Sequence, residues 1–179
     1  AVAVSIPCSL VFADDAKIPD GILLTHNIRY REGASRSWML DLAKPAVQTN
    51  GPRPAIVVIH GGGWIEGDKS SFSTPGVPTP GNIIDFAKLG FVAVTINYRL
   101  AREAPFPAAV ADCRCAVRWL RAHAKEHNVD PERIGVWGNS AGGHLALSGA
   151  VLDCPGEAAD LTKKPHAVLL AYPDITAGD

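Results

Sequence analysis

Residues 136–144 read Val-Trp-Gly-Asn-Ser-Ala-Gly-Gly-His and follow directly on an apolar run that opens at Arg133-Ile134-Gly135. Within them, Gly138-Asn139-Ser140-Ala141-Gly142 fits the pattern Gly-x-Ser-x-Gly, which places a serine on a sharp turn between a strand and a helix. Glycines suit this turn because they carry no side chain and adopt backbone angles that other residues avoid. The pattern predicts that Ser140 is a nucleophile; the alternative is a serine that only caps the helix expected over residues 141–152.

A second glycine-rich segment, His60-Gly61-Gly62-Gly63-Trp64, follows the apolar run Ala55-Ile56-Val57-Val58-Ile59. Such a run is typical of a central parallel strand that is buried on both faces. Three successive glycines leave backbone N–H groups uncovered, and such groups stabilise the negatively charged oxygen of a tetrahedral intermediate. This segment therefore predicts an oxyanion hole.

Together, the two motifs resemble those of the α/β-hydrolase fold esterases, in the branch that is similar to hormone-sensitive lipase and its bacterial carboxylesterase relatives. Further segments match the same branch, namely Gly67-Asp68-Lys69, Asn97-Tyr98-Arg99-Leu100, Phe106-Pro107-Ala108 and Asp130-Pro131-Glu132-Arg133-Ile134. The resemblance extends over residues 22–179, which is nearly the whole chain.

The resemblance implies a role for each site residue. Ser140 attacks an acyl carbonyl, and the N–H groups of Gly62, Gly63 and Ala141 hold the oxyanion. Trp64 either lines the acyl or alcohol pocket or serves only in packing. His60 is expected to be structural rather than the catalytic base. No metal and no organic cofactor is implied.

The implied function is a serine hydrolase that cleaves carboxylic esters through an acyl-enzyme. Short acyl esters are the expected substrates, and acetyl or feruloyl esters of polysaccharide are included. Three alternatives stay open: an arylformamidase-like hydrolase of the same fold, a peptidase-like hydrolase of the same fold, and a catalytically dead, truncated binding module.

The chain departs from the family pattern after Ser140. In this fold the catalytic acid and then the histidine follow the serine along the chain. After the apolar stretch 167–172 the acidic residues are Asp174 and Asp179, and no histidine follows either of them. We therefore expect the acid, the histidine and the last two strands to lie beyond Asp179, or on a second polypeptide that completes the fold. The isolated chain should be close to inactive.

The remaining polar candidates receive structural interpretations. His144 lies one helical turn after Ser140, where a reach back to the serine hydroxyl is doubtful. Arg99 and Asp112 are expected either to pair near the site or to be solvated, with Asp68 in the same structural charge set. The other histidines, at positions 26, 123, 127 and 166, are interpreted as surface or loop residues.

Alternating strands and helices predict the α/β-hydrolase fold, a mostly parallel sheet with helices on both faces. Residues 22–31 and 37–42 favour an antiparallel hairpin at its edge. Helices are expected over 83–89 and 107–127, and strands over 91–97, 133–138 and 167–172. Residues 14–179 are expected to form the N-terminal portion of a single α/β-hydrolase catalytic domain.

The composition excludes several function classes. The 179 residues carry a formal net charge of −1, which leaves no basic face for nucleic acid. No apolar run reaches the roughly 18 residues that a membrane span requires.

Residues 1–13 resemble the end of a signal peptide, with an N-terminal arm as the alternative, so we expect export to the periplasm or the extracellular space. Cys113, Cys115 and Cys154 are expected to form no disulfide, and the Cys113-x-Cys115 spacing does not favour a zinc site. Cys8 is not expected to carry a lipoprotein anchor.

Overall fold

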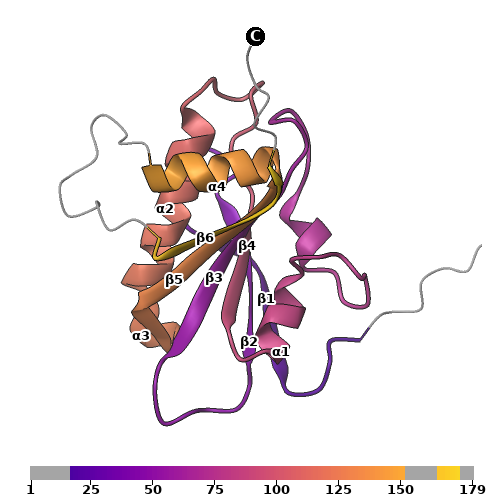
Figure 1. The fold of residues 1–179 in the computed structure, drawn as a ribbon, viewed down its shortest axis with the longest axis vertical. Coiled ribbons are helices and arrows are strands. Elements are labelled where there is room, and N and C mark those ends of the chain that lie inside the picture. Colours follow the sequence, from indigo (N-terminus) through magenta and orange to yellow (C-terminus); the bar gives the residue numbers. More distant parts are fainter. Residues whose placement is uncertain (1–16, 152–164, 174–179) are drawn as a thin grey trace, which may run out of the picture.

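The structure, a computed structural model, describes residues 17–151 and 165–173 (Figure 1). These residues form a six-stranded sheet in the order β1-β2-β4-β3-β5-β6. Its strands are β1 (Ile22–Arg29), β2 (Met39–Pro45), β3 (Arg53–Ile59), β4 (Val92–Ile96), β5 (Val129–Ser140) and β6 (Ala167–Pro173). β1, β2 and β4 pair antiparallel, whereas β4, β3, β5 and β6 run parallel. The predicted N-terminal hairpin on a mostly parallel sheet is therefore confirmed.

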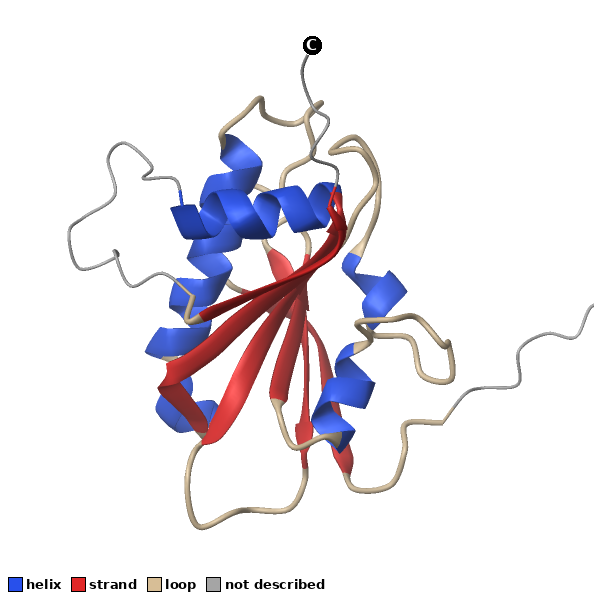
Figure 2. Ribbon diagram, in the orientation of Figure 1, coloured by secondary structure: helices blue, strands red, loops and turns tan. Residues whose placement is uncertain are grey.

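Helices lie on both faces of this sheet (Figure 2). The helical segments are η1 (Lys69–Phe72), α1 (Ile83–Lys88), α2 (Ala108–Ala122), α3 (Ala124–His127) and α4 (Ala141–Val151). Alternate residues of β3 lie on opposite faces of the sheet. On one face, Ile56 and Val58 pack in a buried cluster with residues of η1 and α1. Val57 and Ile59 pack in the other cluster, with residues of α2, α3 and α4. The continuous apolar run of β3 is thus explained by burial on both sides.

The single helix expected over residues 107–127 is wrong, because the chain leaves helical geometry at His123. This residue has φ −98° and ψ 16°, and it separates α2 from the short α3. The His123 ring and backbone N–H both donate to the carbonyl oxygen of Trp119, at 2.8 and 3.0 Å. α3 then ends at Asn128, which adopts the left-handed conformation with φ 57°. The apolar stripe predicted a helix here but carried no signal for this break.

The register of the central strands sets the position of the site. β3 and β5 are neighbours, and Ile59 is paired with Gly138. Because the strands are parallel, the glycine-rich segment and the serine turn leave the sheet side by side at its carboxyl edge. β5 extends beyond the expected 133–138 at both ends, and α4 starts immediately after it.

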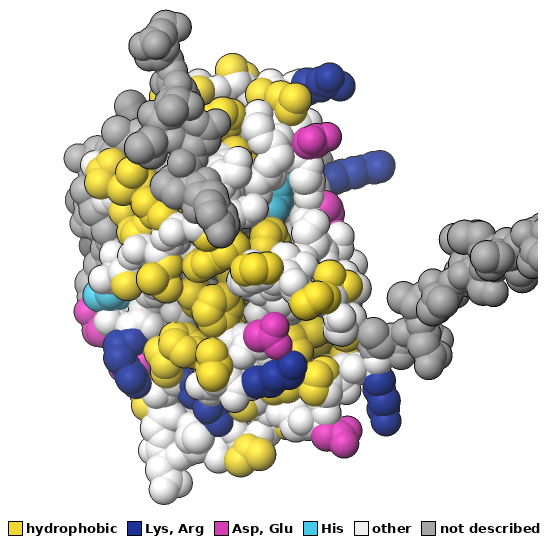
Figure 3. Space-filling model, turned by 45° about the vertical axis from the view of Figure 1, so that its right-hand side comes forward, with side chains coloured by type: hydrophobic (Ala, Val, Ile, Leu, Met, Phe, Trp, Pro, Cys, Tyr) yellow, Lys and Arg dark blue, Asp and Glu magenta, His cyan; other side chains and the backbone are white. Residues whose placement is uncertain are grey.

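Several expectations concern parts of the chain outside the described residues. They include the leader-like segment 1–13, together with Cys8, Cys154, Asp174 and Asp179. Cys113 and Cys115, which are described, carry free thiols. No helix in the described ranges has both the length and the apolar character that a membrane crossing requires. The face in Figure 3 carries its lysine and arginine side chains as separate points rather than as one basic patch.

Candidate active site

Ser140 occupies a strained turn. Its φ is +49°, in the left-handed region that side-chain-bearing residues rarely adopt, and such a conformation typically costs about 1–3 kcal/mol. A Cβ atom on Gly138 would collide with the backbone of Gly142, and a Cβ atom on Gly142 would lie within 2.6 Å of the His60 carbonyl oxygen. Both glycines of the Gly-x-Ser-x-Gly pattern are therefore required by close backbone packing around the serine.

The glycine-rich segment lies directly against this turn. A Cβ atom on Gly61 would be 3.3 Å from the Cβ atom of Ser140. The Gly61 N–H donates to Oδ1 of Asn139 at 3.1 Å, which ties the loop to the residue before the serine. Asn139 contributes this contact, and the sequence pattern gave no sign of it because Asn139 stands at a variable position of the motif.

Two backbone N–H groups of the glycine-rich loop make no hydrogen bond within the described residues. Gly62 and Gly63 have φ values of +111° and +58°. The Gly62 carbonyl oxygen accepts from the N–H groups of Ile65 and Glu66, both at 3.1 Å. Within the described residues, the N–H groups of Gly62 and Gly63 donate to no backbone or side-chain acceptor. Such free donors beside a serine suit the binding of a developing oxyanion.

Asn139 offers a test of how tightly the loop must be held. Asn139→Ala removes one acceptor for a backbone N–H, a loss of about 1 kcal/mol. In the complete protein, we expect kcat for ester hydrolysis to fall about tenfold while KM changes little, because the loop that carries the Gly62 and Gly63 N–H groups is less well fixed. Steady-state kinetics measure kcat and KM separately. A variant that retains full kcat would contradict a positioning role for this amide.

His60 is a structural residue. Its side chain is 3% exposed and stacks on Tyr98, with ring centroids 4.4 Å apart. Nδ1 donates to the Gly61 carbonyl oxygen at 2.7 Å, and Tyr98 donates its hydroxyl to the His60 carbonyl oxygen at 3.0 Å. Burial lowers the pKa of His60, so the ring is neutral near pH 7. These contacts fix the start of the loop, which agrees with the structural role implied by the resemblance.

Arg99 and Asp112 form the expected pair, and Asp112 is fully buried rather than solvated. Arg99 Nε and Nη2 donate to the two carboxylate oxygens, each at 2.8 Å. This hydrogen bonding raises the pKa of Arg99. Asp112 also accepts from Arg31 Nη1 at 2.8 Å and from Trp38 Nε1 at 3.0 Å. Asp68 stands apart from this pair, because it caps η1 by accepting the Ser70 N–H.

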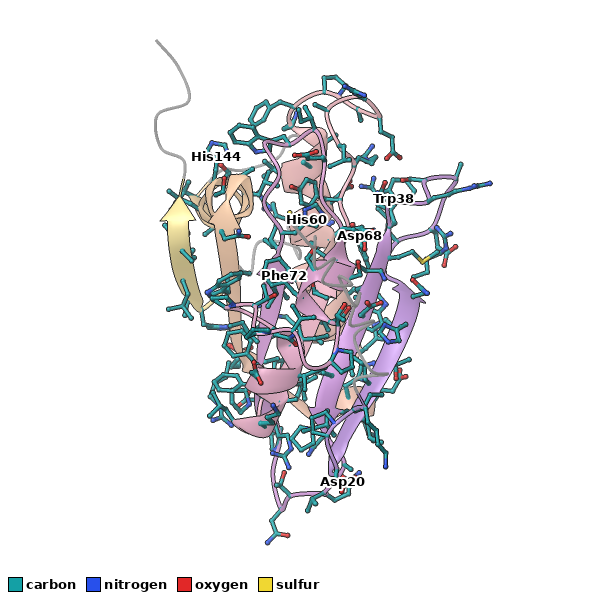
Figure 4. The ribbon with its side chains drawn as sticks, turned by 90° about the vertical axis from the view of Figure 1, so that its right-hand side faces the viewer. Asp20, Trp38, His60, Asp68, Phe72 and His144 are labelled. Carbon is teal, nitrogen blue, oxygen red and sulfur yellow. The ribbon has the colours of Figure 1, made fainter. Side chains whose placement is uncertain are left out.

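Trp64 lines a cavity and packs at the same time. It adopts φ +61°, its ring meets His144 edge-on with centroids 5.3 Å apart, and its carbonyl oxygen accepts the Ala101 N–H at 2.8 Å. The cavity beside it has a volume of about 260 Å³ and is also lined by Phe106 and Leu145. In Figure 4, His60 and His144 lie toward the same end of the sheet and Asp20 toward the other.

The interpretation of His127 as a surface or loop residue is wrong. It ends α3 with only 9% of its surface exposed, and its ring lies 5.5 Å from that of Trp119. Trp119 also stacks on His123, at 4.3 Å, which makes a local aromatic cluster. Burial lowers the pKa of His127. His166 lies near the start of β6, at the opposite end of the strand from the serine, and its N–H donates to the Ile134 carbonyl oxygen.

The lowered pKa values of His60 and His127 give a pH prediction. Each ring is neutral in the folded protein and binds a proton more readily once unfolded, so the free energy of unfolding decreases as pH falls below about 6.5. Urea denaturation between pH 7 and pH 5 should show this loss, and His127→Phe should reduce it. An unchanged loss in the phenylalanine variant would contradict the assignment to His127.

A serine held in a left-handed turn between a parallel strand and a helix, against a glycine-rich loop, is the arrangement typical of the α/β-hydrolase fold. The BD-FAE family matches residues 40–165. The chain therefore belongs to the BD-FAE family.

Comparison with individual proteins gives the same class. Carboxylesterase NlhH of Mycobacterium tuberculosis is 38% identical over 104 residues, which cover 57% of this chain and 30% of that protein. Esterase B of Lactobacillus rhamnosis superposes with a TM-score of 0.70 and 26% identity, over 89% of this chain and 51% of that chain. Thermogutta terrifontis esterase 2, phosphorylated by paraoxon, superposes with a TM-score of 0.67 and 32% identity, over 88% of this chain and 58% of that chain. The chain spans less than a third of the length of the curated relatives it matches.

Proposed function

We propose that the protein is a serine hydrolase of carboxylic esters with Ser140 as its nucleophile. The observation that carries the proposal is the left-handed conformation of Ser140, which is held against the glycine-rich loop by close backbone packing. Strain of this kind persists only where the surroundings enforce it, and it is concentrated at functional sites. The serine hydroxyl is thereby presented at the carboxyl edge of the sheet.

In the proposed mechanism the Ser140 Oγ attacks the ester carbonyl carbon, and its proton passes through a histidine to the departing alcohol. The N–H groups of Gly62, Gly63 and Ala141 bind the oxyanion. Each donor of this kind is typically worth about 10²- to 10³-fold in rate. Water then attacks the acyl-enzyme and releases the acid and the free serine.

The histidine and the acid that orients it are proposed to come from outside the described residues. Two observations support this. His60 is buried against Tyr98 and bound to its own loop, and His166 lies at the far end of β6. Residues 14–179 are accordingly proposed to be the N-terminal portion of the catalytic domain, which a downstream segment or a second polypeptide completes.

Short acyl esters, including acetyl or feruloyl esters of polysaccharide, are the proposed substrates, and the protein is proposed to be exported. The leader-like composition of residues 1–13 supports export. N-terminal sequencing of the expressed full-length protein tests export, and a mature chain that keeps Val2 to Phe12 would overturn it.

A fluorophosphonate probe tests the nucleophile. Mass spectrometry of the labelled protein should place the adduct on the peptide that contains Ser140. Labelling should persist in Ser148→Ala, a control on α4, the helix that follows Ser140. A panel of p-nitrophenyl esters, formylkynurenine and prolyl peptides then compares the three hydrolase classes. Absence of an adduct, or an adduct on another serine, would overturn the proposal.

A further inference from the structure

The glycine-rich loop closes on itself before the chain returns to the sheet. Inside it, the Gly62 carbonyl oxygen accepts from the N–H groups of Ile65 and Glu66, both at 3.1 Å. A Cβ atom on Gly67 would collide with the ring of His60, so the exit of the loop passes directly against its entry. The direction of the Gly62 N–H group therefore depends on where the exit is held as well as on where the entry is held.

The side-chain amide of Asn97 clamps the exit. Its Oδ1 accepts the Lys69 N–H at 2.7 Å, and its Nδ2 donates to Oδ2 of Asp68 at 2.7 Å. Asn97 directly follows β4, and its own backbone is fixed on both sides. Its N–H donates to the Met39 carbonyl oxygen, and its carbonyl oxygen accepts the Tyr30 hydroxyl at 2.7 Å. One amide thus binds the two residues that follow the loop to the carboxyl end of β4.

Asp68 fixes which way the Asn97 amide points. Burial would raise the pKa of Asp68, but hydrogen bonds from the Ser70 N–H and from Asn97 outweigh it, and the pKa lies below its usual value. Asp68 is therefore a carboxylate near neutral pH, and a carboxylate accepts hydrogen bonds but donates none. Nδ2 of Asn97 must face this carboxylate, which leaves Oδ1 to face the Lys69 N–H.

The Lys69 side chain fastens the same point to β2. Its Nζ lies 2.7 Å from Oδ1 of Asp41, and the two side chains are only 8% and 1% exposed. Asp41 also accepts the Ser73 hydroxyl at 2.7 Å and the Asn27 N–H at 2.9 Å. The exit is thus held from β2 and β4, whereas Asn139 holds the entry from β5.

We propose that Asn97 is a positioning residue of the site: by holding the loop exit, it directs the N–H groups of Gly62 and Gly63 toward the oxyanion. The inference rests on the proposed ester hydrolysis. It adds a residue on which the rate depends, next to a strand that carries neither the nucleophile nor the oxyanion donors. Because the oxyanion forms only in the course of the reaction, misdirected donors lower kcat rather than raise KM.

Exchanging the two side chains of the clamp tests the proposal in the complete protein expressed from its own gene. Asn97→Asp sets a second carboxylate against Asp68 and removes the donor between them. The double variant Asn97→Asp/Asp68→Asn again places one amide opposite one carboxylate, and it keeps acceptors for the N–H groups of Lys69 and Ser70. We expect Asn97→Asp to lower kcat for p-nitrophenyl acetate at least about tenfold, with KM changed by less than about twofold. The double variant should recover kcat to within about threefold of the unmodified protein.

Asn82→Ala is the matched control. Asn82 also accepts one backbone N–H, from Ile84 at 3.0 Å, and donates to one carbonyl oxygen, that of Thr74, at 3.0 Å. It caps α1, outside the glycine-rich loop. Asn82→Ala should lower stability toward urea but leave kcat unchanged, whereas Asn97→Ala should lower kcat about tenfold. These two alanine variants add no charge, so they decide the question if Asn97→Asp or the double variant does not fold.

Amide hydrogen exchange follows the loop without any catalysis. The N–H groups of Ile65 and Glu66, which close the loop on Gly62, should exchange at least about tenfold faster in Asn97→Asp. Exchange should return to its original rate in the double variant and stay unchanged in Asn82→Ala. If this pattern appears and the unmodified protein hydrolyses no ester, only the proposed function fails.

Four results would overturn the inference. They are unchanged exchange in Asn97→Asp, an unchanged kcat although exchange is faster, a folded double variant that recovers neither quantity, and an equal effect of Asn82→Ala on the loop.

Discussion

In the complete protein expressed from its own gene, replacement of Ser140 by alanine should lower kcat for ester hydrolysis by about 10⁴- to 10⁶-fold, because loss of the proposed nucleophile removes the acyl-enzyme route. The protein should remain folded, since alanine occupies the space of serine and the packing of Gly138 and Gly142 is unchanged. Hydrolysis of p-nitrophenyl acetate measures the loss, and circular dichroism checks the fold. A folded alanine variant that keeps a tenth of the activity would rule out Ser140 as the nucleophile.

Ser140→Gly is the matched variant for the strain at this position. Both variants lack the hydroxyl, but only glycine accepts φ +49° without a Cβ penalty. That penalty is about 1–2 kcal/mol, and it is partly offset by the greater flexibility of glycine in the unfolded chain, about 0.5–1 kcal/mol. The glycine variant should therefore be inactive and more stable than the alanine variant by up to about 1.5 kcal/mol. Thermal unfolding compares the stabilities of the two variants. A glycine variant that is less stable than the alanine variant would contradict the backbone strain at Ser140.

The second large effect is expected at Asp112. Its carboxylate is 0% exposed and binds Arg99, Arg31 and Trp38. Asp112→Asn keeps the shape but leaves two guanidinium groups close together without their counter-charge. Breaking a buried ion pair in this way typically costs about 3–5 kcal/mol. Urea denaturation should show a loss of this size.

Two comparisons separate the charge effect from a packing defect. Asp85→Asn breaks the exposed pair with Lys88, and it should change stability by about 0.5 kcal/mol or less. Adding Arg31→Met to Asp112→Asn removes one of the two unpaired cations and should recover part of the lost stability. A double variant less stable than Asp112→Asn alone would show that charge balance is not what Asp112 provides.

Local patterns predicted the parts of the site whose geometry is set by neighbouring residues. The serine turn and the glycine-rich loop each depend on glycines at fixed spacing, and the strands before them are marked by continuous apolar runs. Their contact in space depends on β3 and β5 being neighbours in the sheet, which the structure shows and the local patterns do not indicate.

Features that depend on distant residues were not predictable in the same way. Arg31 and Trp38 reach Asp112 across 81 and 74 positions of sequence, and nothing in their local surroundings indicates this contact. The break at His123 and the burial of His127 depend on the packing of Trp119 and its neighbours. A single sequence carries the tendency of each residue to form a helix, but not the tertiary contact that overrides it.

The packing of Gly142 against the end of β3 also bears on how the protein matures. Gly142 lies directly against the carbonyl groups of Ile59 and His60, and Gly61 lies against Ser140, so the serine turn takes its shape from contact with the end of β3. A half-folded chain in which β3 and β5 are not yet paired would hold neither the strained serine nor its neighbouring amides. The turn that strains Ser140 and the loop whose amides lie beside it are therefore both formed by the pairing of the two central strands.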